Sequence, residues 1–287
     1  MDMHTGSFTL ALVVVTAISV VAHPVHAQVE EPSDPSDLSP YWHPDVSRWE
    51  RIIVQYAEKR RMDPNLVASV IWKESRGDAS VRGPTGAVGL MCVQPYPWRP
   101  SADELRNPWT NLEAGTKTLA QVVRDGNGDV YYALAAYNGG WEQVHIRITR
   151  EYATDVLDNY VRAVAVENGL PPDGDWVAVI SVEGLSDHKT VTVLGPDRAL
   201  ARYTERPWRQ AGVPSAPVDR LPHATLIAYT DESGRAARVD LWLVAQERAL
   251  QGAPGLLPSD RSTDLPRTGI AETAWRPIPT ARPAGPP

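Results

Sequence analysis

The chain has 287 residues, of which 43% are hydrophobic and 22% charged, which suffices for one large globular domain or two modest ones. Its net charge of −7, without a block of Lys and Arg, argues against nucleic acid or an anionic membrane surface as a partner. The single cysteine, Cys92, excludes an internal disulfide, so packed cores must stabilise the fold.

The first 27 residues have the pattern of an export signal. A mainly apolar run from Phe8 to Ala22 precedes small residues that end at Ala27, as at a signal cleavage site. The run is shorter than the roughly 20 residues of a membrane-spanning helix. Because no Lys or Arg precedes the run, an uncleaved N-terminal membrane anchor is the alternative. We therefore expect residues 1–27 to be a signal peptide, and the rest to be exported to the periplasm, the cell wall or the extracellular space.

Residues 45–170 are predicted to form an all-helical domain with long loops. An acidic, proline-rich segment over 28–44, typical of a linker, precedes it. Asp45 is a suitable N-cap for the first helix, and Trp49, Ile52, Ile53 and Tyr56 form one face of that helix. Helical spacing predicts further helices beginning at Pro64 and over 111–124, 130–137 and 153–166.

After Gly174 the spacing of apolar residues changes from helical to alternating. Strands are predicted over 176–183, 189–194, 223–230 and 238–244. Asp231–Gly234 is a typical hairpin turn between the last two, so we expect a small antiparallel β domain over 175–248, with an irregular insert that holds Trp208. Proline-rich residues 251–287 are expected to be a disordered tail. The predicted fold class is therefore α+β.

Glu74 lies on the apolar face of the helix that begins at Pro64. This face is formed by Val67, Val70 and Ile71. A carboxylate on such a face loses hydration, so its pKa should rise and it can hold a proton near neutral pH, as a general acid must. On the helix alone, the alternative is a Glu that turns to solvent or pairs with Arg76.

Four blocks in order extend this hypothesis: Glu74–Ser75, then GAVGLMCVQP over 86–95, NLEAG over 111–115 and ALAAYNGG over 133–140. Together they resemble the catalytic domain of the soluble lytic transglycosylases, which share a fold with goose-type lysozyme. The resemblance covers roughly residues 45–168. It implies cleavage of the MurNAc-GlcNAc β-1,4 bond of peptidoglycan glycan strands, with 1,6-anhydro-MurNAc ends as products and no cofactor or metal.

The resemblance implies a mechanism with one glutamate, whereas common glycosidases use two carboxylates. Glu74 would first act as an acid and then as a base on the C6 hydroxyl of the muramic sugar, whose N-acetyl group stabilises the anomeric carbon. None of the other nearby carboxylates occupies a motif position, and we interpret them as surface groups: Asp78, Asp103, Glu104, Glu113 and Asp129.

Substrate-binding roles are also implied by position. Ser75 would hydrogen-bond near the scissile sugar, or only bond helix backbone, and Met91 would wall the sugar site, or be plain core. Gly86 and Gly89 would let the backbone approach the sugar closely, or be simple turn residues.

Three further residues on the predicted helices have implied roles. Tyr137 and Asn138 would face Glu74, with the phenol orienting the carboxylate and the amide holding an N-acetyl or hydroxyl group. Tyr160 resembles the tyrosine of the closing Tyr-Val pair. Without the resemblance, both tyrosines would be interpreted as core residues.

Cys92 departs from the family pattern, which has a substrate-binding glutamine at this position. A thiol is a poor donor and acceptor, so either Gln94 has taken over this contact or the substrate preference is altered. We do not expect Cys92 to be a nucleophile, because no histidine lies in a suggestive neighbouring motif.

Asp125–Asp129 resembles the start of a calcium loop but lacks the required glycine and terminal glutamate, so a helix–helix turn is the better interpretation. Two alternatives to a lytic transglycosylase remain open at this point. The first is a hydrolytic lysozyme on the same fold, and the second is an inactive glycan-binding or scaffold protein. The β domain could bind a protein or glycan partner, or merely cap the helices.

Overall fold

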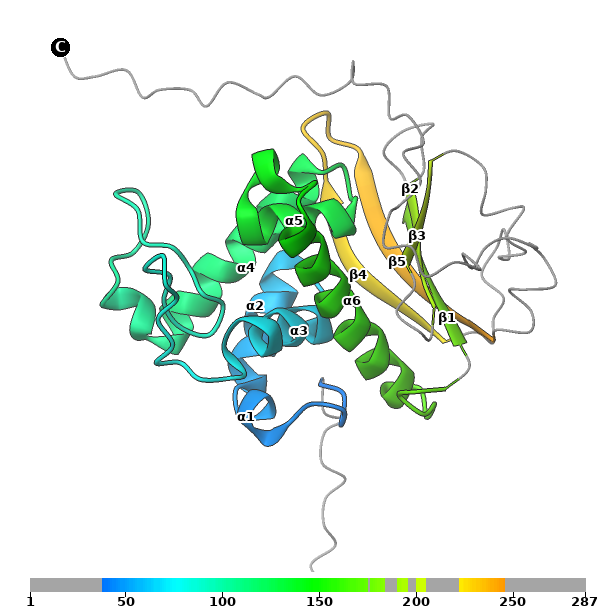
Figure 1. The fold of residues 1–287 in the computed structure, drawn as a ribbon, viewed down its shortest axis with the longest axis horizontal. Helices are drawn as coiled ribbons and strands as arrows, with labels where there is room; N and C mark the ends of the chain where they lie inside the picture. Colours follow the sequence, from blue (N-terminus) through cyan, green and yellow to red (C-terminus); the bar gives the residue numbers. More distant parts are fainter. Residues whose placement is uncertain (1–37, 175, 184–189, 196–199, 205–221, 246–287) are drawn as a thin grey trace, which may run out of the picture. The chain divides into compact units, whose positions relative to one another are not determined.

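Helices followed by an antiparallel sheet make up the protein in a computed structural model, which describes residues 38–174, 176–183, 190–195, 200–204 and 222–245 (Figure 1). The fold class is α+β, as predicted. The predicted signal peptide, Trp208 and the predicted tail lie outside the described residues, so the predicted bounds of the signal peptide and of the tail stay predictions. Within the described residues, no helix combines the length and apolar character needed to cross a membrane.

In the described residues, six α-helices precede the sheet. They are α1 (Pro44–Ser47), α2 (Glu50–Arg60), α3 (Pro64–Ser75), α4 (Pro108–Asp125), α5 (Val130–Gly139) and α6 (Arg147–Glu167), with short 3-10 helices η1 (Glu104–Arg106) and η2 (Trp141–Gln143). The predicted helix that begins at Pro64 is α3, and Asp63 caps it, because the Asp63 side chain accepts a hydrogen bond from the backbone N–H of Asn65 at 2.8 Å. The turn at Asp125–Asp129 joins α4 to α5, and Asp129 caps α5.

The predicted first helix is wrong in its start and continuity. α1 is capped by His43 rather than Asp45, and a break separates it from α2. The break is held by two donors on one carbonyl: the Arg48 guanidinium and the Trp49 indole both donate to the Gly77 oxygen, at 2.8 and 2.9 Å. These contacts come from a distant loop, so local helical spacing could not predict them.

The helical core also extends further toward the N-terminus than expected. Leu38 and Trp42, which fall in the segment expected to be a linker, are buried. The Trp42 indole donates to the Asn65 side chain at 2.8 Å, and the Ser39 hydroxyl donates to the Ala163 carbonyl at 2.7 Å. Residues 38–43 are therefore part of the packed fold.

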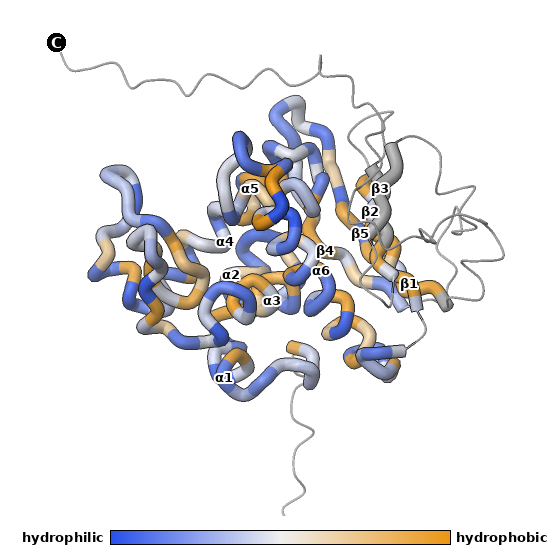
Figure 2. Tube along the Cα trace, in the orientation of Figure 1, coloured by the Kyte–Doolittle hydropathy of each residue, from blue (hydrophilic) through white to orange (hydrophobic). Residues whose placement is uncertain are grey.

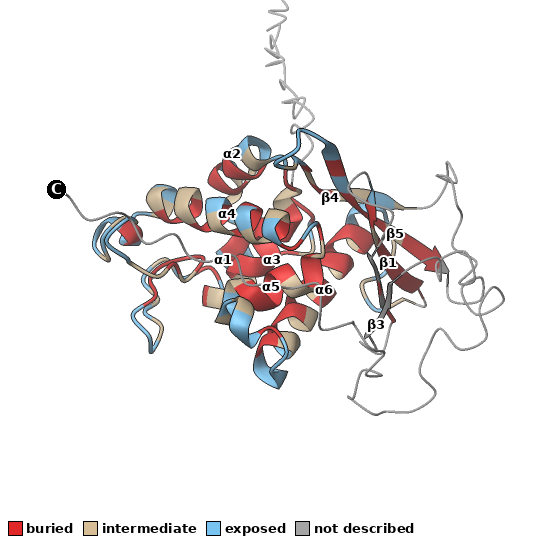
Figure 3. Ribbon diagram, turned by 90° about the horizontal axis from the view of Figure 1, so that it is seen from above, coloured by how far each residue is buried: buried red, intermediate tan, exposed pale blue. Residues whose placement is uncertain are grey.

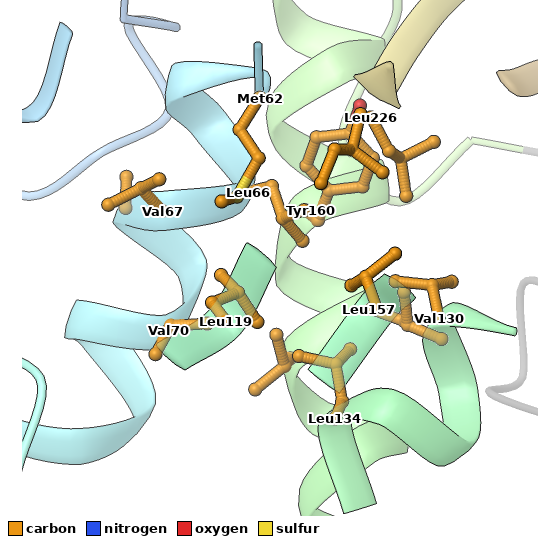
Figure 4. Packing of buried hydrophobic residues seen from close by; sticks show 14 of the residues in the cluster. Met62, Leu66, Val67, Val70, Leu119, Val130, Leu134, Leu157, Tyr160 and Leu226 are labelled. Carbon is orange, nitrogen blue, oxygen red and sulfur yellow. The ribbon is translucent and has the colours of Figure 1, made fainter. Parts of the chain in front are cut away.

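α3 lies at the centre of the helices. Apolar residues are concentrated on α3 and α5 (Figure 2), and buried residues gather where α3, α5 and α6 meet, whereas outer faces of α2 and α4 are exposed (Figure 3). Leu66 and Val70 of α3 lie on the side that faces Leu119 of α4 and Leu157 of α6, in one buried cluster (Figure 4). This packing fixes the direction of the last turn of α3, where Glu74 lies.

The sheet has five antiparallel strands in the order β3-β2-β1-β5-β4. They are β1 (Trp176–Glu183), β2 (Thr190–Leu194), β3 (Leu200–Thr204), β4 (His223–Thr230) and β5 (Ala236–Ala245). Four of them match predicted strands. The exception is β3, which falls in the segment predicted to be an irregular insert. The sequence of β3 does not show a clear strand pattern, and its hydrogen bonds to β2 hold it in the sheet.

An edge of the sheet is joined to the start of α3. The Asp63 N–H donates to the Leu226 carbonyl, and the Ala228 N–H donates to the Arg61 carbonyl, both at 2.9 Å. Between these bonds, Met62 pairs with Ile227. Side chains also pack in this region: Met62, Leu226 and Tyr160 of α6 belong to one buried hydrophobic cluster (Figure 4). Strand β4 thus continues its hydrogen bonding into the loop that precedes α3.

Candidate active site

Glu74 occupies the last turn of α3 and is partly buried. Burial raises the pKa of its carboxyl, as the apolar helix face predicts. Hydrogen bonds from Tyr152 and Cys92 and the charge of Lys73 act in the opposite direction. Burial thus favours the protonated carboxyl, whereas the two hydrogen-bond donors and Lys73 favour the charged carboxylate.

Tyr152 of α6 makes a short hydrogen bond with this carboxyl. Its hydroxyl donates to Glu74 Oε1 at 2.6 Å. Burial and the nearby Glu74 charge hold the pKa of Tyr152 well above its ordinary value, so the phenol keeps its proton and acts as a donor. Sequence reasoning missed this residue, although it lies four residues before Val156 on the buried face of α6.

The Tyr137 phenol does not orient the Glu74 carboxylate, contrary to the prediction. It donates instead to the Met91 carbonyl at 2.8 Å. Tyr137 still lies near Glu74, because the Glu74 charge adds to the rise that burial causes in the pKa of Tyr137. Asn138, the next residue, is exposed at the end of α5. Tyr152 therefore performs the role predicted for Tyr137, and Tyr137 holds the neighbouring loop.

Tyr160 is not part of this site, which corrects the prediction for that residue. It is fully buried, and its hydroxyl donates to Asp63 Oδ2 at 2.9 Å. Asp63 precedes the first turn of α3, whereas Glu74 is in the last turn, so Tyr160 contacts the opposite end of the helix. From α6, where Figure 4 shows it, Tyr160 thus holds the side chain of Asp63, the residue that caps α3.

The loop that carries Met91 and Cys92 is fixed by Asn111 of α4. The Asn111 side chain is fully buried and accepts from the Met91 N–H at 2.8 Å. Its amide donates to the carbonyls of Val88 and Leu105, at 2.7 and 2.9 Å. All three partners are backbone groups, so the NLEAG block is connected to the GAVGLMCVQP block by one side chain.

Two glycines allow this close packing. A Cβ on Gly89, whose φ is +80°, would lie 2.3 Å from the Asn111 amide nitrogen, and one on Gly115 would lie 2.5 Å from Met91 Sδ. Met91 is fully buried and Gly89 contacts Asn111, so both act in packing rather than as surfaces open to a sugar. Gly86 also has a positive φ, of +89°, and has open space around its Cα.

Ser75 behaves as the alternative interpretation predicts. Its buried hydroxyl donates to the Leu90 carbonyl at 2.8 Å and accepts from the Gly77 N–H at 3.2 Å. It thus joins the end of α3 to the Met91 loop. Its contacts are with backbone, and it supports the position of Glu74 indirectly.

Cys92 lies directly beside Glu74. Its thiol donates to the Glu74 carbonyl oxygen at 3.6 Å. Burial and the Glu74 charge raise the pKa of Cys92 to about 12, so the thiol stays protonated and is a poor nucleophile. The Gln94 amide donates to the Thr85 hydroxyl, and among the described residues none of its hydrogen bonds reaches Glu74. The structure thus brings Cys92, and not Gln94, to the carboxyl.

The other nearby carboxylates are engaged away from Glu74. Asp78 and Glu104 accept from Ser80 and Ser101, while Glu113 pairs with Lys59 and Arg60. Asp103 lies near Arg106 at 3.8 Å, and Asp129 caps α5. In the part of the chain that the structure describes, no cluster of three or more His, Cys, Asp or Glu side chains could hold a metal ion.

The raised pKa of Glu74 predicts that the substitution Glu74→Gln stabilises the fold at neutral pH. Because the pKa of Glu74 is higher in the folded than in the unfolded protein, its contribution to stability is fully present below the unfolded pKa. This contribution is lost as the pH rises through the folded pKa and the buried carboxyl becomes charged. The amide removes the burial of charge, so the melting temperature should rise at pH 7.5 and change little at pH 4. Thermal melts at both pH values, with Glu151→Gln on the surface of α6 as the control, measure this; an equal shift at both would contradict it.

Comparison with known proteins matches residues 51–158 to the family model "Transglycosylase SLT domain". This segment therefore carries a transglycosylase SLT domain, as the four sequence blocks predict. Among curated proteins, the chain is 29% identical over 113 residues to a membrane-bound lytic murein transglycosylase E of Buchnera aphidicola. That match covers 33% of this chain and 51% of the relative.

A transglycosylase of Enterobacteria phage PRD1 is 32% identical over 114 residues, with 39% of this chain and 43% of the relative covered. The chain thus spans about half the length of the curated relatives it matches. Among solved structures, an inactive mutant of the lytic transglycosylase Slt from Pseudomonas aeruginosa aligns with a TM-score of 0.39 and 24% identity. That alignment covers 44% of this chain and 25% of the other.

Proposed function

We propose that the protein is an exported peptidoglycan lytic transglycosylase that cleaves the β-1,4 bond between MurNAc and GlcNAc. The observation that carries this proposal is the Glu74 carboxyl, whose pKa is raised by burial and whose Oε1 accepts from the Tyr152 hydroxyl at 2.6 Å. The SLT domain over 51–158 supports the substrate class.

The proposed reaction uses Glu74 twice. In the first step its carboxyl donates a proton to the glycosidic oxygen as the bond from the anomeric carbon to that oxygen breaks. The N-acetyl group of the muramic sugar stabilises the anomeric carbon. In the second step the carboxylate takes the proton of the C6 hydroxyl, and that oxygen bonds to the anomeric carbon. Glu74 thereby regains its proton, and no water is consumed.

Tyr152 supports the charged state between the two steps. Its phenol donates to the carboxylate that remains after the first proton transfer, and it is itself held protonated by burial. A short hydrogen bond to an ionised acceptor is stronger than one between neutral groups, so the contact favours the state in which Glu74 acts as a base.

The proposed mechanism predicts that the digestion products carry 1,6-anhydro ends and that EDTA leaves the rate unchanged. Mass spectrometry of muropeptides distinguishes them from hydrolysed products, which contain an additional water. Reducing ends alone would indicate the hydrolytic lysozyme alternative, which the fold serves equally well. Binding of glycan without any cleavage would indicate the inactive glycan-binding or scaffold alternative.

Substitution of Tyr152 by Phe should change the pH profile of the reaction. The hydroxyl lowers the pKa of Glu74, so its removal raises that pKa further and shifts the loss of activity at alkaline pH to higher pH. The maximal rate should fall about tenfold, because the carboxylate loses a donor. Tyr160→Phe on the same helix is the matched control and should keep the profile of the unmodified chain. Initial rates across pH check this, and an unshifted alkaline limb in Tyr152→Phe would contradict it.

A further inference from the structure

A pair of stacked aromatic rings lies on the surface just after the loop that holds Cys92. The ring centroids of Tyr96 and Trp98 are 5.2 Å apart, and their planes differ by 11°. The side chains are 47% and 78% exposed, and Trp98 is the most exposed large hydrophobic residue in the described part of the chain. The guanidinium of Arg99 lies 5.4 Å from the centre of the Tyr96 ring. We call Tyr96, Trp98 and Arg99 the aromatic platform.

The backbone under the aromatic platform is restrained. Prolines alternate with the two aromatic residues, at Pro95, Pro97 and Pro100, and each fixes its own φ. The Arg99 N–H donates to the Tyr96 carbonyl at 2.9 Å and closes a turn. The two rings are therefore presented in a stacked arrangement before any ligand binds, which reduces the entropy lost on binding.

The aromatic platform directly follows the loop that contacts Glu74. It follows Met91 and Cys92 in the segment between α3 and α4, which lies on the side of the helices away from the sheet (Figure 1). Burial raises the pKa of Tyr137, the charge of Glu74 adds to the rise, and Arg99 opposes it. Cys92, whose thiol donates to the Glu74 carbonyl oxygen at 3.6 Å, precedes Tyr96 by only four residues, so the aromatic platform begins a short stretch of chain from Glu74.

The chemistry of the aromatic platform suits a sugar ring. A flat apolar face matches the C–H groups on one face of a pyranose, and its two rings are too small an apolar area for a stable protein interface. The other exposed large hydrophobic side chains belong to α4 or the start of α6: Trp109, Ile146 and Ile148. The guanidinium of Arg99 beside the Tyr96 ring adds a positive charge that suits a carboxylate.

We propose that the aromatic platform is a binding subsite for one sugar of the glycan strand, next to the site of cleavage. Trp98 stacks on the sugar ring, and Arg99 meets a carboxylate of the attached lactyl or peptide group. The inference rests on the proposed function, because it takes the strand as the substrate. Because the aromatic platform would contact the sugar equally in the ground state and the transition state, it should raise the affinity for the strand without changing the rate of the chemical step.

Sedimentation with purified peptidoglycan sacculi tests the subsite. Glu74→Gln serves as the parent, so that binding is measured without lysis. Adding Trp98→Ala should weaken binding roughly three- to tenfold, the range expected for one aromatic stacking contact, and Trp98→Phe should restore most of it. Trp109→Ala, which removes a 39% exposed tryptophan outside the aromatic platform, is the matched control and should stay within about twofold of the parent. With Glu74 intact, Trp98→Ala should raise KM by the same factor and leave kcat unchanged.

Several results would overturn the subsite. Unchanged binding of the Trp98→Ala variant is one, and an equal loss in the Trp109→Ala variant is another, because it would indicate general adhesion. Self-association that Trp98→Ala abolishes would assign the surface to a second copy of the chain. If the unmodified chain lyses sacculi while Trp98→Ala changes neither binding nor KM, the subsite fails and the proposed function stands. If the unmodified chain neither lyses nor sediments with sacculi, both fail.

Discussion

Glu74→Gln is expected to reduce lysis of purified peptidoglycan by about 10²- to 10⁴-fold, the usual contribution of a positioned general acid. The amide is nearly isosteric with the carboxyl and keeps an oxygen that can accept from Tyr152, so the surrounding contacts need not change. It has no acidic proton to give to the leaving oxygen and cannot take one back. Turbidity loss of a sacculus suspension, followed at pH 5 to 8, measures the effect.

The matched control is Glu113→Gln, which changes a carboxylate that pairs with Lys59 and Arg60 on α2. It should retain activity, because an exposed ion pair of this kind contributes little to stability. Far-UV circular dichroism confirms that both variants are folded. Activity of Glu74→Gln within threefold of the unmodified chain would end the assignment of Glu74 as the catalytic residue.

Asn111→Ala should be the most destabilising substitution near the site. It leaves the Met91 N–H and the carbonyls of Val88 and Leu105 without their side-chain partner. The Val88 carbonyl keeps its bond from the Val93 N–H, so two buried groups lose their partner. Each costs about 1–3 kcal/mol when left unpaired, so a total of about 2–6 kcal/mol is expected. At roughly 2–4 °C per kcal/mol for a fold of this size, the melting temperature should fall by on the order of 10 °C. Differential scanning calorimetry measures it.

Two variants sharpen this test. Asn111→Asp keeps the shape and the acceptor for Met91, but it places a carboxylate oxygen against two carbonyls, so it should also destabilise. Asn168→Ala removes an exposed amide that donates only to the Val164 carbonyl, and should lower the melting temperature by no more than a few degrees. A smaller effect of Asn111→Ala than of Asn168→Ala would show that water replaces the lost contacts.

The helices and most strands could be predicted because their apolar residues repeat at the period of the element. Val67, Val70 and Ile71 place Glu74 on a buried face without any knowledge of its neighbours. What packs against that face depends on α6, which is more than 70 residues away in the chain. The choice of Tyr152 over Tyr137 or Tyr160 as the partner of Glu74 is therefore a tertiary property, and the local sequence does not encode it.

The motif residues were predicted as a group more accurately than as individuals. The resemblance assigned Ser75, Gly89 and Met91 to the substrate, whereas the structure engages them with backbone and core. A motif marks positions whose side chains are constrained, and the constraint can come from the ligand or from the loop that holds the catalytic group. Asn111 shows the second case, because its three bonds are all internal.

The pairing of strand β4 with Arg61 and Asp63 has a consequence for the order of folding. α3 is made early during synthesis, but the backbone groups just before its first turn bond to Leu226 and Ala228, which are made near the end of the described chain. Closing such a long loop is entropically unfavourable until most of the native contacts exist, so this contact slows folding. The helices can collapse first, yet the segment that leads into α3 is completed only when β4 is in place. A newly made chain therefore completes the start of the helix that carries Glu74 late, once β4 has formed.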